Sequence, residues 1–173
     1  MEEISIQVEN AAKEAIKMEI NGRDFYNQAA EVTHNELGKK MFQKLAQEEI
    51  KHIETFSRLI SSILKGDDWQ KYIRDDELKG KSPLVEALAS RMKHAEGKSE
   101  IEALSIAMEL EEKGIAFYKK SAEEVDDPQA REIFEKICEE ERSHYDLLQA
   151  QHDSLTNSGF WFDSAEFRMD GKF

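Results

Sequence analysis

The chain is poor in helix-breaking residues and in the residues that cross-link small proteins. Its 173 residues include two prolines, eight glycines and a single cysteine, Cys138. One cysteine excludes an internal disulfide framework, a Cys-x-x-Cys redox motif and a zinc ribbon, and it fits a reducing cytosol. No apolar run approaches the roughly 20 residues that a membrane-spanning helix needs. The first ten residues, MEEISIQVEN, lack the pattern of a signal peptide. We therefore expect a cytoplasmic protein without a membrane segment.

Basic side chains are also scarce relative to acidic ones. The chain has 24 Lys and Arg residues against 37 Asp and Glu residues, which gives a net charge of -13. A polyanion of this kind repels nucleic acids and anionic membrane surfaces, so neither is an expected partner. Solubility alone explains most of these charges. The chain is long enough for one domain with a sizeable core.

Apolar residues recur every three or four positions over most of the chain, and this is a helical period. Short turns make antiparallel neighbours, whereas a long link can run the length of a helical bundle. We therefore predict two helical hairpins joined by a crossover over about 65–99, which contains a short extra helix. The pattern predicts long helices over about 4–32, 37–64, 100–125 and 128–155.

Residues 1–155 are thus predicted to form one all-α four-helix bundle. The turn before the fourth helix supports its start, because Asp127 is a suitable N-cap and Pro128 suits the first helical position. Residues 156–173 are rich in aromatic side chains. We expect this tail to be non-helical and to pack on the bundle or on a partner subunit.

The second hairpin repeats the sequence pattern of the first with a shift of 92 positions. AIKMEINGRDFY at 15–26 aligns with AMELEEKGIAFY at 107–118. In the next helix of each hairpin, EEIKH at 48–52 aligns with EERSH at 140–144. Two hairpins with one pattern predict a bundle with internal pseudo-twofold symmetry.

Ionisable residues interrupt the apolar stripes of these helices, at positions that face a bundle interior. At 1.5 Å per residue, the Glu residues of both hairpins lie about 22 Å from their turns, so antiparallel packing brings them to one level. The first helix has two rows of apolar residues, and Glu19 lies at the boundary between them. The prediction that Glu19 faces inward therefore rests partly on the repeat. The six residues are Glu19, Glu49, His52, Glu111, Glu141 and His144.

Four carboxylates buried together require something that cancels their charge, because even one buried ion costs several kcal/mol. One interpretation is a buried network of Glu and His residues that share protons. The other is a pair of divalent cations, whose charge balances four carboxylates. Mixed oxygen and imidazole donors suit iron or manganese. The matched pattern in the two hairpins favours the pair of metal ions.

Other histidines serve as internal controls. Glu31 and His34 have the same three-residue spacing, but the positions 92 residues later hold no such pair. We therefore expect both at the surface. His94 and His152 lack a Glu three residues earlier, and neither is a candidate ligand.

A Glu from each of two helices, combined with Glu-x-x-His from each of the other two, resembles the ligand pattern of ferritin-like di-iron carboxylate proteins. The chain looks most similar to the rubrerythrin and bacterioferritin branch, and to small stand-alone rubrerythrin-like proteins. The resemblance implies a ferritin-like four-helix bundle that holds two iron ions, or alternatively manganese or a mixed Fe/Mn pair. Glu49 and Glu141 would bridge the metals. The remaining ligands would serve one metal each: Glu19 with His52, and Glu111 with His144.

Tyr26 and Tyr118 lie two turns beyond Glu residues of the set. They are either hydrogen-bond donors to the carboxylates or ordinary core aromatics.

Two positions differ from the pattern of the families that the chain resembles. Gly114 stands where rubrerythrins place an extra Glu, which weakens the case for their redox-linked ligand exchange. Ile50 stands where bacterioferritins carry a haem-ligating Met, so no haem is expected.

The resemblance implies a redox enzyme that reduces H₂O₂ or O₂. Because the chain lacks paired cysteines, electrons would come from an external donor such as a rubredoxin-type protein. Ferroxidase activity with iron storage or delivery is one alternative, and a manganese catalase-like enzyme is another. We expect a homodimer or a larger homo-oligomer.

Overall fold

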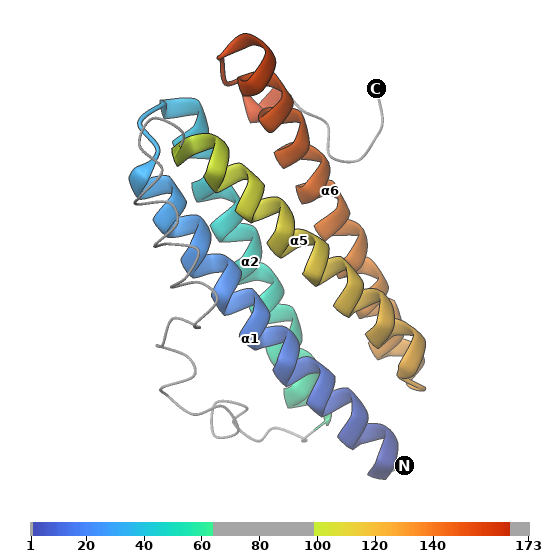
Figure 1. The fold of residues 1–173 in the computed structure, drawn as a ribbon. Helices are drawn as coiled ribbons and strands as arrows, with labels where there is room; N and C mark the ends of the chain where they lie inside the picture. The colour runs from blue at the N-terminus through green and yellow to red at the C-terminus, as the bar shows by residue number, and fades with distance from the viewer. Residues whose placement is uncertain (1, 64–98, 167–173) are drawn as a thin grey trace.

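The computed structural model describes residues 2–63 and 99–166, which form a bundle of four long α-helices (Figure 1). A short 3-10 turn, η2 (Ser164–Glu166), follows in the tail. The described residues contain no strand. The all-α four-helix architecture expected from the helical period is therefore confirmed. The helices are α1 (Glu2–Val32), α2 (Glu36–Ile63), α5 (Ser99–Glu124) and α6 (Pro128–Ser158).

The helices form two antiparallel hairpins, α1 with α2 and α5 with α6 (Figure 1). The start of α5 lies beside the turn of the first hairpin, because the backbone N–H of His34 donates to Glu100 Oε1 at 3.1 Å. Helix α2 ends at the opposite end of the bundle (Figure 1). The crossover and its short helix were expected over 65–99. They lie outside the described residues, apart from Ser99, which begins α5.

Helix α6 extends three residues beyond its expected end at Leu155. It stops at Gly159, whose φ of 77° is left-handed and whose N–H donates to the Leu155 carbonyl at 3.0 Å. Glycine adopts this conformation without steric cost, so it terminates the helix. At the other end, the Asp127 side chain accepts a hydrogen bond from the Ala130 N–H at 3.0 Å, as its N-cap position predicts.

The apolar core divides into two clusters, one towards each pair of helix ends. The cluster near the first turn includes Phe25 and Phe42, and the cluster near the second turn includes Phe56 and Phe134. On α2, α5 and α6 the ionisable residues of the repeat fall between the two clusters, and on α1 Glu19 lies at the edge of the second cluster, next to Ile20. The polar level is therefore sealed from both ends of the bundle by packed aromatic and aliphatic side chains.

The described part of the tail packs on the bundle. The Trp161 indole is buried, lies 6.0 Å from the Phe42 ring between centroids, and donates its N–H to Glu100 Oε2 at 3.0 Å. The fully buried amide of Gln151 donates to the Phe162 carbonyl at 2.9 Å and accepts from the Phe162 N–H at 3.2 Å. A polar residue in the apolar stripe of α6 is thus satisfied by the tail backbone.

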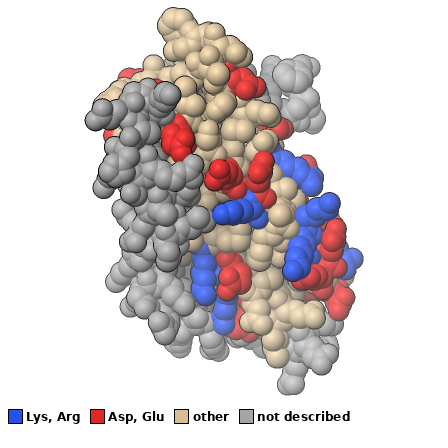
Figure 2. All heavy atoms as spheres, in the orientation of Figure 1, with Lys and Arg blue, Asp and Glu red and all other residues tan. Residues whose placement is uncertain are grey.

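Acidic and basic side chains are interspersed on the face of the bundle that Figure 2 shows. Ion pairs also form within single helices, such as that between Lys13 Nζ and Glu9 Oε1 at 2.7 Å. Among the described residues, none of the helices is both long enough and apolar enough to cross a bilayer.

Candidate metal centre

The structure brings all six ionisable residues of the repeat together inside the bundle. Each is at most 4 % exposed. Their potential ligand atoms form two overlapping groups, and within each group the atoms lie within 4.8 Å of one another. One group contains Glu19, Glu49, His52 and Glu141, and the other contains Glu49, Glu111, Glu141 and His144.

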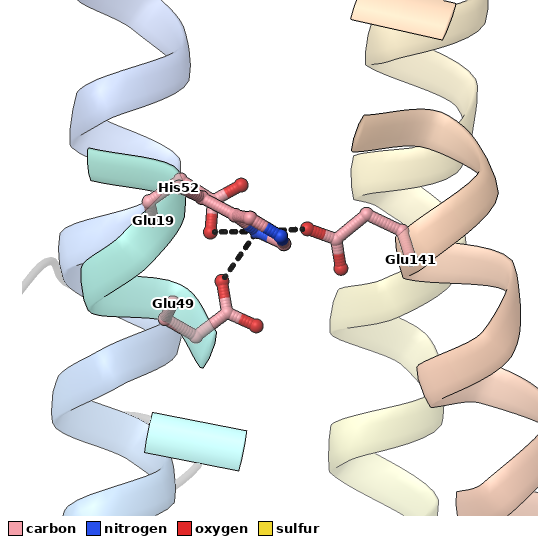
Figure 3. A group of neighbouring side chains, drawn as sticks. All are labelled: Glu19, Glu49, His52 and Glu141. Atoms are coloured by element: carbon pink, nitrogen blue, oxygen red, sulfur yellow. Dashed lines mark hydrogen bonds and ion pairs between the residues drawn. The ribbon is translucent and has the colours of Figure 1, made fainter. Parts of the chain in front are cut away.

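The first group surrounds Nδ1 of His52 (Figure 3). This nitrogen lies 3.1 Å from Glu141 Oε1, 3.3 Å from Glu19 Oε2 and 3.8 Å from Glu49 Oε2. Glu49 and His52 share a face of α2 because residues three apart are neighbours on a helix. Glu141 reaches the group from the other hairpin (Figure 3). The group therefore exists only when the two hairpins pack together.

The second group surrounds Nδ1 of His144. This nitrogen lies 3.5 Å from Glu141 Oε2, 3.6 Å from Glu111 Oε1 and 3.8 Å from Glu49 Oε1. It is buried and has no hydrogen-bond partner. A buried polar atom without a partner is costly, and a metal ion is one partner that satisfies an imidazole nitrogen. The residues present therefore fit a metal at this position.

Glu49 and Glu141 belong to both groups, and each divides its two oxygens between the two imidazoles. Glu49 directs Oε2 to the His52 side and Oε1 to the His144 side. Glu141 directs Oε1 to His52 and Oε2 to His144. This is the orientation that carboxylates bridging two metal ions require. The bridging role itself stays a prediction.

Tyr26 and Tyr118 each donate a hydrogen bond to a carboxylate of the other hairpin. The Tyr26 hydroxyl donates to Glu111 Oε1, and the Tyr118 hydroxyl donates to Glu19 Oε1. Burial, followed by the charge of nearby carboxylates, raises the pKa of both tyrosines well above the usual value. Both hydroxyls therefore keep their protons and act as donors. The two bonds cross between α1 and α5 and orient one Glu of each group.

We expect Tyr118→Phe to lower the free energy of unfolding of the metal-free protein by about 1–3 kcal/mol, because it leaves a buried carboxylate oxygen without its donor. Urea denaturation followed by circular dichroism measures the change. Tyr145→Phe is the matched control, since the Tyr145 side chain is partly exposed on α6, and surface substitutions usually stay within about 0.5 kcal/mol. Equal losses in the two variants would contradict the role of Tyr118.

Glu140 also contacts the cluster, although the sequence did not single it out. Its Oε2 lies 2.7 Å from His52 Nε2, the nitrogen that faces away from the first group. This hydrogen bond lowers the pKa of Glu140. A carboxylate on the far nitrogen orients a ligating imidazole and leaves the other nitrogen for metal. The sequence feature that could have indicated Glu140 is the Glu-Glu doublet, which occurs in both hairpins as Glu48-Glu49 and Glu140-Glu141.

The doublet of the first hairpin behaves differently. Glu48 is the counterpart of Glu140, but it pairs with Lys51 Nζ at 3.1 Å on its own helix. The repeat has Ser143 where the first copy has Lys51. The pseudo-twofold symmetry of the six residues is thus broken by their surroundings.

Protons hold the cluster together when no metal is bound. Burial favours the neutral form of His52, but hydrogen bonds to Glu140, Glu141 and Glu19 outweigh burial and raise the pKa to about 12. Burial likewise opposes protonation of His144, yet the carboxylates of Glu111 and Glu141 raise its pKa to about 10. The metal-free cluster therefore carries two imidazolium ions at neutral pH.

Glu111 takes up a further proton. Burial and then the negative charge of Glu141 raise the pKa of Glu111 to about 8, so at pH 7 this carboxyl is mostly protonated. The proton-sharing network and the metal pair are thus two states of the same six residues. Binding of cations must displace the protons, because both occupy the same lone pairs.

The residues that were set aside lie elsewhere. Glu31 and His34 are exposed, as the missing second copy predicted. His152 is partly exposed and lies 3.8 Å from Asp153. His94 lies outside the described residues.

Comparison with known proteins gives one family and one related structure. The family model described as Rubrerythrin matches residues 10–152. A solved structure of a hypothetical protein from Pyrococcus furiosus has a TM-score of 0.65 at 26% sequence identity, over 87% of this chain and 90% of that chain. No curated protein matches. The family match includes all six residues of the cluster.

Proposed function

Because the chain belongs to the rubrerythrin family, we propose that it is a di-iron oxidoreductase that reduces hydrogen peroxide, or O₂, with electrons from an external donor. One observation carries the proposal. Two groups of buried carboxylate and imidazole donors share Glu49 and Glu141 at one level of the bundle. Such a mixed set of carboxylate and imidazole donors suits iron or manganese.

The chain's own residues prepare the site for a pair of cations. Four carboxylates balance the charge of two divalent ions, and the two imidazoles supply neutral donors once their protons have left. Tyr26 and Tyr118 hold the outer carboxylates in place. When bound, a pair of Fe(II) ions supplies the two electrons that cleavage of a peroxide O–O bond requires. The apolar clusters on either side close off the site from the two ends of the bundle.

The electron donor is proposed to be a separate protein of the rubredoxin type. Within these 173 residues the single cysteine, Cys138, is buried and donates weakly to the Ile115 carbonyl at 3.6 Å. It has no cysteine partner with which to hold a second iron site. This supports the proposal that a separate protein supplies the electrons.

The reaction with peroxide tests the proposal. When anaerobic protein loaded with Fe(II) meets one equivalent of H₂O₂ per chain, we expect two Fe(II) ions to be oxidised per peroxide, and faster than by O₂. Stopped-flow absorbance and a colorimetric assay of residual Fe(II) give the rate and the stoichiometry. Glu31→Ala is the matched control, because Glu31 is exposed and lies outside the cluster; it should react like the parent protein.

Two other outcomes would replace the proposal. Evolution of O₂ from peroxide without a reductant, by protein that contains manganese, would indicate a catalase-like enzyme. Uptake and oxidation of iron far beyond two ions per chain would indicate storage. Neither outcome is expected.

A further inference from the structure

A cavity of about 100 Å³ adjoins the cluster between α1 and α5. A water molecule needs about 10–15 Å³ of such space, so the cavity has room for a ligand of several heavy atoms. Its residues are pairs related by the repeat. The pairs include the apolar Met18 and Leu110, the two glycines Gly22 and Gly114, and the carboxylates Glu49 and Glu141.

The two glycines are unexpected in these positions. Gly22 and Gly114 lie in the interiors of α1 and α5, where glycine is the least favourable residue after proline. Among the described glycines, only Gly159 has a positive φ, so the backbone does not require glycine at either position. Both copies of the repeat nevertheless carry it.

Packing does not require glycine at Gly114 either. A Cβ added there would lie 3.9 Å from Tyr118 and 4.0 Å from the Glu141 side chain, and these are ordinary van der Waals contacts. At Gly38, by contrast, a Cβ would lie 2.8 Å from the Trp161 ring, so close packing explains that glycine. What Gly114 provides is empty space above the Glu141 carboxylate.

We propose that Gly22 and Gly114 determine substrate specificity by keeping open a port between α1 and α5, and that the port admits an organic hydroperoxide with a short alkyl group as well as H₂O₂. This proposal rests on the proposed function. An uncharged hydroperoxide avoids repulsion by the carboxylates that line the cavity. Its alkyl group would lie against Met18 and Leu110, with the O–O bond directed to Glu49 and Glu141.

The reaction of such a substrate balances in the same way as that of H₂O₂. The O–O bond of ROOH breaks, two electrons come from the external protein donor, and two protons come from the buffered solvent. The products are the alcohol ROH and one water molecule. The substrate class thus requires no co-reactant beyond the donor already proposed.

Gly114→Ala is the sharpest test, because a methyl group fits there without pressing on a ligand, whereas at Gly22 it would lie 3.4 Å from the Glu49 carboxyl. We expect the variant to bind two iron ions and to melt about 2–4 °C higher, as a helical Gly→Ala change predicts. The dissociation constant of azide, titrated optically against the oxidised iron-loaded protein, should rise about tenfold, because one methyl group in a small pocket has this effect.

Asn27→Ala is the matched control. Asn27 is exposed on α1, so alanine there raises helix propensity without narrowing the cavity. This variant should melt higher but bind azide like the parent. The ratio of kcat/KM for tert-butyl hydroperoxide to that for H₂O₂ should fall about tenfold in Gly114→Ala and stay constant in the control.

The possible outcomes distinguish a failure of the port proposal from a failure of the proposed function. If Gly114→Ala keeps two irons but changes neither azide affinity nor the kcat/KM ratio, the port is wrong and the di-iron function stands. A parent protein that reduces H₂O₂ but not tert-butyl hydroperoxide would refute the organic substrate class. A parent that binds no iron pair would overturn the proposed function itself.

Discussion

Replacing either Glu49 or Glu141 with alanine is expected to reduce the bound metal from two ions per chain to one or fewer. Both carboxylates belong to both ligand groups, so either substitution removes a donor from each metal position. The variants also leave three carboxylates to balance two divalent ions in a buried site, which is electrostatically unfavourable. Elemental analysis after loading with Fe(II) and desalting gives the stoichiometry.

Two control variants sharpen this experiment. Glu31→Ala should retain two ions, because Glu31 is exposed and lies outside the cluster. Glu140→Ala removes only the hydrogen bond behind His52, so it should retain both positions while weakening metal affinity by about 10–100-fold. If Glu49→Ala and Glu141→Ala both kept two ions per chain, the assignment of the bridging ligands would be refuted.

Metal binding is expected to release about three protons per chain at pH 7 and to strengthen as the pH rises, because coordinating groups must be deprotonated. The pKa values of His52 and His144 are raised to about 12 and about 10, and that of Glu111 to about 8. All three groups therefore carry protons at pH 7 that coordination must displace. Calorimetric titrations in buffers of different ionisation enthalpy count the protons released. Affinity that is constant between pH 6 and pH 8 would contradict this expectation.

The same groups set how the stability of the metal-free protein depends on pH. The folded-state pKa values of both histidines lie above 6.5, so their contribution is complete below pH 6.5 and is lost as the pH rises towards 10 and 12. The folded-state pKa of Glu111 lies above 4.5, so the cost of ionising the buried carboxyl grows between pH 4.5 and 8. Both effects destabilise the metal-free fold as the pH increases.

We therefore expect the melting temperature of the metal-free protein to fall from pH 6 to pH 9, and the gain on adding metal to grow over the same range. The lowered pKa of Glu140 acts only at acidic pH, where its contribution is lost as the pH falls below 4.5. Differential scanning calorimetry with and without chelator tests both trends. A metal-free protein that became more stable towards pH 9 would show that protons do not hold the cluster together.

The positions of the six clustered residues were predictable because two independent regularities agree. The 3–4 spacing of apolar residues placed them on inward stripes, and the 92-residue shift matched each Glu and His of one hairpin with a partner in the other. Glu19 shows why both were needed. Its helix has two apolar rows, so periodicity alone left its direction open, and in the structure it is buried.

The contacts of Glu140 and Gln151 could not be predicted from the apolar spacing or from the repeat. Glu140 is half-exposed at its own helix surface, yet it reaches His52 across the bundle. Gln151 occupies a core position and is satisfied by the backbone of a tail residue, Phe162. Both residues depend on a partner from another segment of the chain. The sequence of their own helix does not indicate which residue that partner is.

By itself, the sequence determined that this protein is a bundle of two similar hairpins with acid and imidazole groups at one level, because helical period and internal repeat are properties of the chain alone. Only the tertiary structure decided which carboxylate oxygen faces which imidazole, that Tyr26 and Tyr118 reach across to the opposite hairpin, and that Gly114 borders open space. These features depend on the rotation and separation of neighbouring helices. A period of 3.6 residues fixes neither quantity.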